Sequence, residues 1–235
     1  MKTLWDWIKK SYVRLIDPVA DWLVRWRVHP NTITIFGTLC TVAGGVIYGT
    51  GHIRTAGWFL GLTALFDVLD GTVARRSNRS STFGAFLDST LDRIADGAVM
   101  AGLATFYALN PVHRSVPMMI VCLLGLIGAF LTSYTRARAE ALGIDAKVGI
   151  LQRPERVTLL SAPQAFFGLA LNGWVLAVII VILTVTAWVT VVQRIAFVYR
   201  ATHSDAEARL TRDTPGVPLW TRHKRPAARP ALKGE

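Results

Sequence analysis

The chain has 235 residues, 52% of them hydrophobic, and a formal net charge of +11 from 26 Lys and Arg against 15 Asp and Glu. A soluble domain of this length is not normally so apolar and so basic at the same time. The excess of positive charge therefore indicates either a nucleic-acid partner or a membrane with an anionic face. The two cysteines lie inside apolar runs without disulfide or zinc spacing, so we expect both to behave as small apolar side chains.

Residues 1–28 are predicted to form an amphipathic helix that lies in the headgroup region of a membrane. Apolar side chains recur there at helical spacing, with lysines and arginines between them. The tryptophans of this segment suit the membrane interface. Pro18 is expected to kink or divide the helix, and residues 29–32 to form a turn and cap before the next helix.

Six further stretches are apolar enough to cross a bilayer, which takes roughly 20 mostly apolar residues. They run over residues 32–50, 56–76, 84–108, 117–138, 156–172 and 174–199. The predicted fold class is therefore an all-α integral membrane protein, in which residues 29–200 form a domain of six transmembrane helices. Residues 201–235 are polar and rich in Pro and Arg, and we expect them to form a disordered cytoplasmic tail.

The basic residues alternate in step with the predicted spans. Three of the connections hold only Arg54 and Arg114, whereas the other connections and the two terminal segments hold nearly all the remaining Lys and Arg. By the positive-inside rule, this predicts a multi-pass protein of the cell membrane with both termini in the cytoplasm. A DNA-binding protein has no reason to alternate its charges in this way. We therefore expect the lipid bilayer, and no nucleic acid, as a partner.

The second and third predicted spans contain five aspartates: Asp67, Asp70, Asp88, Asp92 and Asp96. A charge at the bilayer centre costs about 2.5–3.5 kcal/mol on insertion scales, so this cluster needs an explanation beyond packing. The first two aspartates are three residues apart and the next two are four apart, so each pair shares a helix face, and a hairpin brings the pairs together. Such carboxylates repel one another unless they are protonated or bridged by a cation. Oxygen ligands favour Mg²⁺, with Mn²⁺ or Ca²⁺ as alternatives, whereas ion pairing with nearby arginines is the structural alternative.

The spacing of these residues is specific. Residues 67–92 read D-x2-D-G-x2-A-R-x8-G-x3-D-x3-D, with eight defined residues at fixed positions. This signature resembles that of the CDP-alcohol phosphatidyltransferases at every fixed position, and the six-span layout behind an interfacial helix is also similar to that family. The resemblance implies a metal-dependent phosphotransferase that is a homodimer. It would transfer a phosphatidyl group from CDP-diacylglycerol to a small alcohol, release CMP, and have its active site facing the cytoplasm.

The same resemblance implies roles for individual residues. The ligands of two Mg²⁺ ions would be Asp67, Asp70, Asp88 and Asp92. Asp92 would also be the catalytic general base, which takes the proton from the acceptor hydroxyl. The residues that would bind the CDP-lipid are Asp67, Gly71, Ala74, Arg75 and Gly84. Asp96 lies outside the signature, and we expect it to pair with Arg93.

Two segments outside the signature bear on the acceptor. Residues 133–140 and 153–156 resemble the corresponding segments of bacterial phosphatidylinositol-phosphate synthases. The resemblance implies a cationic pocket for the phosphate of a phosphorylated alcohol, formed by Ser133, Arg136, Arg156 and Arg194, and arginine grips phosphate in bidentate fashion. The best acceptor is then inositol 1-phosphate. The alternatives are glycerol 3-phosphate, which would make the protein a phosphatidylglycerol-phosphate synthase, or another head-group acceptor. Arginines can instead extend into lipid headgroups, which we expect of Arg138 and Arg153.

A function of another class would be a membrane scaffold or a transporter without transferase activity. Transporters usually place intramembrane carboxylates near the midplane, on broken helices. The aspartates of this chain are instead predicted to cluster toward one membrane face, beside arginines. A catalytically silent scaffold should have lost at least one residue of the signature, and none is missing. The sequence therefore favours the enzyme.

Overall fold

The computed structural model describes residues 17–151 and 153–213, with side chains through residue 203, and this part of the chain is helical without any strand. A short helical segment, residues 17–25, precedes the larger helices. These are α2 (Pro30–Gly49), α3 (Ile53–Arg76), α4 (Thr82–Leu109), α5 (Val116–Ala141), α6 (Arg153–Phe167), the 3₁₀ turn η1 (Leu171–Gly173) and α7 (Trp174–Asp213).

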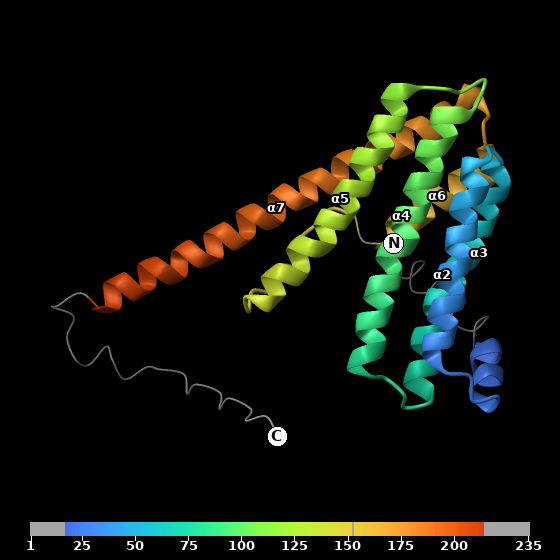
Figure 1. The fold of residues 1–235 in the computed structure, drawn as a ribbon. Helices are drawn as coiled ribbons and strands as arrows, with labels where there is room; N and C mark the ends of the chain where they lie inside the picture. Colours follow the sequence, from blue (N-terminus) through green and yellow to red (C-terminus); the bar gives the residue numbers. More distant parts are fainter. Residues whose placement is uncertain (1–16, 152, 214–235) are drawn as a thin grey trace, which may run out of the picture.

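The helices form a compact group from which two long helices diverge. In Figure 1, α2, α3 and α4 run side by side, and α2 packs against both of the others. α6 packs against α3, and α5 packs against both α4 and α7. Toward their C-terminal ends, α5 and α7 lean away from the α2–α4 group, as Figure 1 shows. The molecule is therefore closed at one end and open at the other.

The connections that reverse the chain have recognisable caps. α3 ends at Arg76, and Asn78 adopts a left-handed conformation with φ 51° in the short turn that follows. The Ser81 side chain then accepts a hydrogen bond from the backbone N–H of Gly84, at 3.0 Å, and caps the N-terminus of α4. Ser115 caps α5 in the same way. The turn after α3 is what places its aspartates beside those of α4.

Small residues let helices approach closely at two positions. A Cβ atom at Gly102 of α4 would overlap the carbonyl oxygen of Gly45 on α2. A Cβ atom at Gly57 of α3 would lie 2.5 Å from the backbone nitrogen of Ala165 on α6. Small residues at helix contacts are how membrane helices bring their backbones together. These contacts hold α2 against α4, and α6 against α3.

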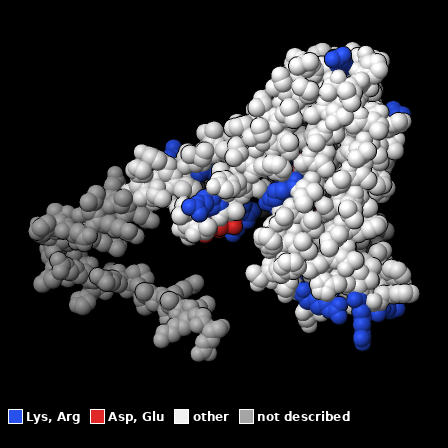
Figure 2. Space-filling model, in the orientation of Figure 1, with Lys and Arg blue, Asp and Glu red and all other residues white. Residues whose placement is uncertain are grey.

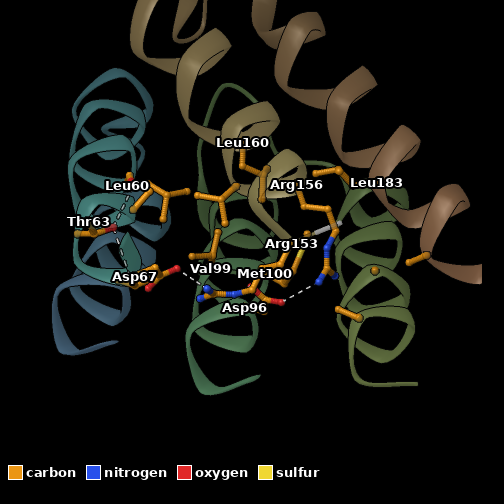
Figure 3. Close-up of a pocket in the computed structure, with 16 residues that line it drawn as sticks. Leu60, Thr63, Asp67, Asp96, Val99, Met100, Arg153, Arg156, Leu160 and Leu183 are labelled. Atoms are coloured by element: carbon orange, nitrogen blue, oxygen red, sulfur yellow. Dashed lines mark hydrogen bonds and ion pairs between the residues drawn. The ribbon is translucent and has the colours of Figure 1, made fainter. Parts of the chain in front are cut away.

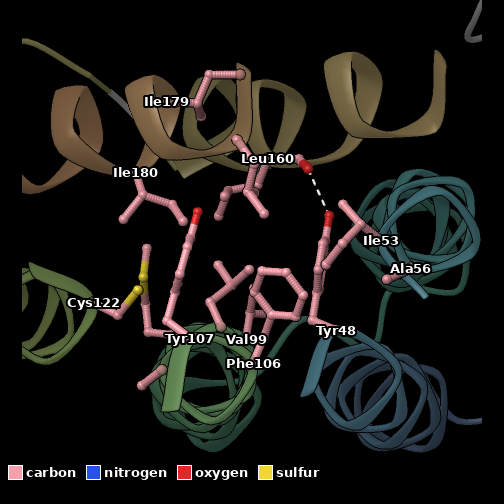
Figure 4. Packing of buried hydrophobic residues seen from close by; sticks show 14 of the residues in the cluster. Tyr48, Ile53, Ala56, Val99, Phe106, Tyr107, Cys122, Leu160, Ile179 and Ile180 are labelled. Atoms are coloured by element: carbon pink, nitrogen blue, oxygen red, sulfur yellow. Dashed lines mark hydrogen bonds between the residues drawn. The ribbon is translucent and has the colours of Figure 1, made fainter. Parts of the chain in front are cut away.

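An apolar core fills the closed end of the molecule. Tyr48, Phe106 and Leu160, from α2, α4 and α6, are buried there with residues of α3, α5 and α7 (Figure 4). The Tyr48 hydroxyl donates a hydrogen bond of 2.7 Å to the carbonyl oxygen of Leu160, so the core contains a satisfied polar contact. Both cysteines are free, and Cys122 is buried in this core, as the sequence predicts.

Within the described part of the chain, four helical segments are long and apolar enough to cross a membrane: Pro30–Gly49, Ile53–Arg76, Val116–Ala141 and Leu171–His203. Their outward side chains include many exposed large hydrophobic residues, and Figure 2 shows a mainly uncharged surface with basic side chains toward its ends and in a hollow. α4 carries three aspartates and Arg93, and α6 has only 15 residues. The apolar helices make this a multi-pass membrane protein, while the six-span arrangement stays a prediction.

The structure describes only a part of each predicted terminal segment. Residues 1–16 lie outside the described part, so the amphipathic helix over 1–28 stays a prediction. Its last portion, residues 17–25, is helical and packs Ala20 against Ile33 and Val73, while Trp22 and Trp26 are exposed. At the other end, α7 continues to Asp213, so residues 201–213 are helical within the segment predicted as a disordered tail. Residues 214–235 lie outside the described part.

The close approach of α2 and α4 gives a first prediction. Gly102→Ala should destabilise the protein by about 1–3 kcal/mol, because the added methyl group overpacks the contact with Gly45. Gly61→Ala is the matched control, since its Cβ atom would lie 3.6 Å from Ser161, an ordinary contact, and alanine favours helix. The thermal unfolding midpoint in detergent measures both. Equal midpoints for the two variants would contradict the packing assignment.

Candidate active site

The α3–α4 hairpin places the signature aspartates at the open end of the molecule, where Asp70 lies near Asp88 and Arg153 joins Asp67 to Asp92. Asp70 and Asp88 line one cavity of about 190 Å³ with Gly71, Ala74 and Gly84. The two carboxylates come from α3 and α4, and the three small residues leave room beside them. Of the residues predicted to bind the CDP-lipid, three therefore meet at one place, whereas Asp67 and Arg75 do not line this cavity.

Asp70 is the most buried of the five aspartates of α3 and α4, with 9% of its surface exposed. Its carboxylate accepts a hydrogen bond of 2.8 Å from the hydroxyl of Thr34 on α2. A buried carboxylate needs such donors, because its desolvation is costly. Thr34 also lines the same cavity as Asp70, together with Asn31. Neither residue was predicted from the sequence, because nothing in their spacing links α2 to the signature.

Arg153, the first residue of α6, lies among the carboxylates (Figure 3). Its guanidinium forms ion pairs with Asp67, with Asp92 at 2.9 Å and with Asp96 at 3.8 Å. The side chain is 23% exposed. The expectation that Arg153 extends into lipid headgroups is therefore wrong. The physical reason is that α6 packs against α3, so the start of α6 faces the acidic hairpin instead of the membrane surface.

The predicted pairing of Asp96 with Arg93 is also wrong. Asp96 lies 3.8 Å from Arg153 and 3.4 Å from Arg156, both on α6. Arg93 instead bonds to the carbonyl oxygen of Ser89 on its own helix and lies 3.9 Å from Asp92. Asp96 therefore connects the acidic hairpin to α6.

The four residues predicted for the acceptor phosphate line a single larger cavity of about 450 Å³. They come from three helices: Ser133 and Arg136 from α5, Arg156 from α6 and Arg194 from α7. Asp92 lines the same cavity, so the predicted general base faces the predicted acceptor site. Lys147 and Arg153 also line it and were not predicted. This is the hollow that Figure 2 shows between the diverging helices, with basic side chains on its wall.

The arginines of this cavity are held in different ways. Arg194 donates to two backbone carbonyl oxygens, those of Val148, at 2.9 Å, and Thr132. Arg136 pairs with Glu140 at 2.9 Å, one helical turn along α5. Arg156 pairs with Asp96. Carbonyl partners leave the charge of Arg194 uncompensated, whereas carboxylates offset the charges of the other two.

The metal-binding prediction can be compared with the geometry of the carboxylates. In the part of the chain that the structure describes, no three His, Cys, Asp or Glu side chains converge as a group that could hold a metal ion. However, one cationic group, the Arg153 guanidinium, contacts Asp67 of α3 and Asp92 of α4 together. The hairpin therefore brings carboxylate oxygens of both helices to one cation. An all-oxygen donor set of this kind fits a hard divalent ion.

Comparison with known proteins agrees with the signature. The CDP-alcohol phosphatidyltransferase family matches residues 27–195 of the chain. A phosphatidylinositol phosphate synthase of Mycobacteroides abscessus is 38% identical, over 79% of this chain and 84% of the relative. An archaetidylinositol phosphate synthase of Methanothermobacter thermautotrophicus is 36% identical, over 80% of this chain and 90% of the relative.

Solved structures agree as well. The phosphatidylinositol phosphate synthase of Mycobacterium tuberculosis with CDP-DAG bound superposes with a TM-score of 0.72 and is 35% identical, over 79% of this chain and 94% of that one. The same protein in complex with manganese and citrate also has a TM-score of 0.72, over 78% and 88% of the two chains. The fold and the acidic hairpin define a membrane-embedded phosphotransferase. The chain belongs to the CDP-alcohol phosphatidyltransferase family, so the scaffold and transporter alternatives are not supported.

The contact between Thr34 and Asp70 gives a second prediction. Thr34→Val should lower the thermal unfolding midpoint and weaken the binding of CDP-diacylglycerol, because it removes a donor from a buried carboxylate, at a cost of about 1–3 kcal/mol. Thr38→Val is the control. Its hydroxyl donates only to the carbonyl oxygen of Thr34, one turn back in the same helix. The assignment of Thr34 is wrong if the two variants bind the lipid equally well.

Proposed function

We propose that this protein transfers the phosphatidyl group of CDP-diacylglycerol to inositol 1-phosphate and releases CMP. The observation that carries this proposal is the single cavity formed by Ser133, Arg136, Arg156 and Arg194, with Asp92 on its wall. Such a cavity suits an acceptor that bears a phosphate, since arginine binds phosphate oxygens in bidentate fashion. The names of the relatives support inositol phosphate as the headgroup.

The nucleotide end of the donor lipid would occupy the smaller cavity between α3 and α4. Gly71, Ala74 and Gly84 leave space there for the cytidine, beside Asp70 and Asp88. Arg75 is exposed one turn after Gly71, where it would contact the diphosphate. The relative that has CDP-DAG bound supports a binding site for this lipid in the shared fold.

The divalent ions would be held by the carboxylates of the signature: Asp67, Asp70, Asp88 and Asp92. We infer Mg²⁺ as the ion, in two copies, with Mn²⁺ as the alternative, which the manganese complex of the relative supports. When bound, such ions neutralise the diphosphate and make CMP a better leaving group. Asp96 is not in this set, because it lies outside the signature.

The residues of the acceptor cavity would orient the attack. Arg156 and Arg194 would hold the phosphate of the acceptor, which leaves its free hydroxyl directed at Asp92. Asp92 would take the hydroxyl proton as the new oxygen–phosphorus bond forms and the bond from phosphorus to the CMP oxygen breaks. Holding both reactants in one place supplies much of the rate enhancement in reactions of this kind.

Glycerol 3-phosphate is the alternative acceptor, because it offers the same phosphate to the same arginines. The two relatives from different domains of life favour inositol phosphate. Their names differ in the lipid part, phosphatidyl against archaetidyl, and agree in the inositol phosphate headgroup. The headgroup is therefore what these similar chains have in common.

The topology that accompanies this function is also a proposal. We infer that residues 29–200 form a catalytic domain of six spans, with the acidic hairpin and the arginine-rich cavity toward the cytoplasm and both termini on that side. The basic connections of the sequence support this orientation. A homodimer in the cell membrane, which the family resemblance implies, is part of the same proposal.

The acceptor proposal predicts a substrate preference. Purified protein in detergent, given CDP-diacylglycerol and Mg²⁺, should release CMP fastest with inositol 1-phosphate. Release should be slower with glycerol 3-phosphate, which lacks the ring hydroxyls, and slowest with inositol, which offers no phosphate to the arginines. Rates are compared by chromatography of the released CMP. Faster release with glycerol 3-phosphate would assign the protein to the alternative.

The roles of the aspartates predict two different defects. Asp92→Asn should abolish turnover while leaving CDP-diacylglycerol binding largely intact, because an amide cannot accept the proton. Asp67→Ala should weaken metal-dependent binding of the lipid itself. Asp21→Asn is the control, since Asp21 is exposed and pairs with Arg76. Lipid binding and CMP release are measured separately. Wild-type turnover by Asp92→Asn would show that another group is the base.

A further inference from the structure

Arg153 makes contacts that the signature does not explain. Its guanidinium bridges Asp67 on α3 and Asp92 on α4, and its Nε atom lies 3.8 Å from Asp96. Two of these three carboxylates belong to the signature, whereas Asp96 does not. A single side chain of α6 therefore provides the positive charge for carboxylates from both arms of the hairpin.

The position of Arg153 also links two cavities. It lines a small cavity of about 40 Å³ together with Asp67 and Asp96, which Figure 3 shows. It also lines the larger cavity that contains Ser133 and Arg194. The guanidinium thus lies on the boundary between the carboxylates and the acceptor cavity. A rotation of this flexible side chain would be enough to move its charge from the carboxylates to the larger cavity.

A divalent ion and the guanidinium of Arg153 compete for the same oxygen atoms. The Oδ2 atom of Asp67 accepts a hydrogen bond from Arg153, and the Oδ1 atom of Asp92 lies 2.9 Å from the same guanidinium. Both residues are proposed metal ligands. Two cations at these oxygens would also repel each other in a site of low dielectric constant. An ion that takes these oxygens therefore displaces the guanidinium from them.

We propose that Arg153 is an exchangeable internal cation of the active site. It holds Asp67 and Asp92 together, gives up their oxygens to a divalent ion, and turns its guanidinium into the larger cavity, where it binds the phosphate of the acceptor. Asp96 keeps Arg153 in place during this exchange, because it forms an ion pair with Nε of Arg153 and another with the neighbouring Arg156. This inference rests on the proposed function, since it uses the same metal ligands and the same acceptor cavity.

The exchange has a thermodynamic consequence. Metal binding frees Arg153 for the acceptor, so the metal tightens binding of the acceptor phosphate, and the acceptor phosphate tightens binding of the metal by the same factor. A permanent ion pair makes a different prediction for a variant that lacks the arginine. Loss of a nearby positive charge favours the metal in either case, because two cations repel each other. Only the exchange predicts that the acceptor phosphate no longer tightens metal binding in such a variant, so this coupling separates the two roles.

The test measures Mn²⁺ affinity of the purified protein in detergent, from the electron paramagnetic resonance signal of free Mn²⁺, with and without inositol 1-phosphate. Arg153→Gln should bind Mn²⁺ at least about fivefold more tightly than wild type, which is the lower end of typical coupling between sites. Inositol 1-phosphate should tighten Mn²⁺ binding in wild type and have little effect in this variant. Arg114→Gln, an exposed arginine in the α4–α5 connection, is the control for loss of a charge. Asp67→Ala should leave the signal of free Mn²⁺ undiminished, which shows that the bound ion of the wild type belongs to this site.

Arg153→Lys keeps the proposal testable if the glutamine variant does not fold. Lysine keeps the charge but lacks the fork that contacts two carboxylates together, so this variant should bind Mn²⁺ more tightly than wild type and less tightly than Arg153→Gln. Unchanged or weaker Mn²⁺ binding by the folded variants overturns the exchange, as does an equal effect of inositol 1-phosphate on wild type and Arg153→Gln. A wild-type protein that shows the exchange but releases no CMP with any phosphorylated acceptor would overturn the proposed function and leave the exchange standing.

Discussion

The constraint on which the rest of this structure depends is the charge of the α3–α4 hairpin. Carboxylates that lie close together in an environment of low dielectric constant repel one another strongly, and they are stable there only beside a cation. α6 supplies that cation, because Arg153 at its first residue contacts Asp67 and Asp92. The same requirement draws the start of α6 into the helix group and places Arg156, one turn later, in the wall of the larger cavity. The charge of one hairpin thus organises both substrate sites.

The two ends of the molecule serve different purposes. At the closed end, glycines let α2 contact α4 and α3 contact α6, and Tyr48, Phe106 and Leu160 are packed in the apolar core. At the other end the polar residues gather, and the divergence of α5 and α7 leaves the larger cavity open between them (Figure 1). A rigid apolar half can hold the hairpin in register, whereas an open polar half can admit a lipid headgroup and a charged acceptor.

The sequence predicted the parts of the site that depend on local spacing, and it missed those that depend on long-range packing. Helical periodicity and the predicted hairpin were sufficient to place Asp70 and Asp88 close together, and both line one cavity. The family resemblance grouped Ser133, Arg136, Arg156 and Arg194, and these line another cavity. The pairing of Arg153 and Asp96 depends on how α6 enters the helix group after a connection without helical periodicity, so the sequence offered no signal for it. The predicted end of α6 at residue 172 was also too late. Gly168 adopts a left-handed conformation with φ 56°, and the helix ends at Phe167.

The charges that line the larger cavity favour an acceptor of a particular charge. Its lining includes six basic side chains, Arg93, Arg136, Lys147, Arg153, Arg156 and Arg194, against two aspartates, Asp92 and Asp96. All of these except Arg194 have carboxylate partners, whereas Arg194 is held by backbone carbonyl oxygens, which orient its guanidinium without neutralising it. A neutral alcohol would leave this charge uncompensated in a confined space. A phosphate offsets it and gains charge-assisted hydrogen bonds, so the arrangement of the arginines selects for an acceptor that carries its own negative charge.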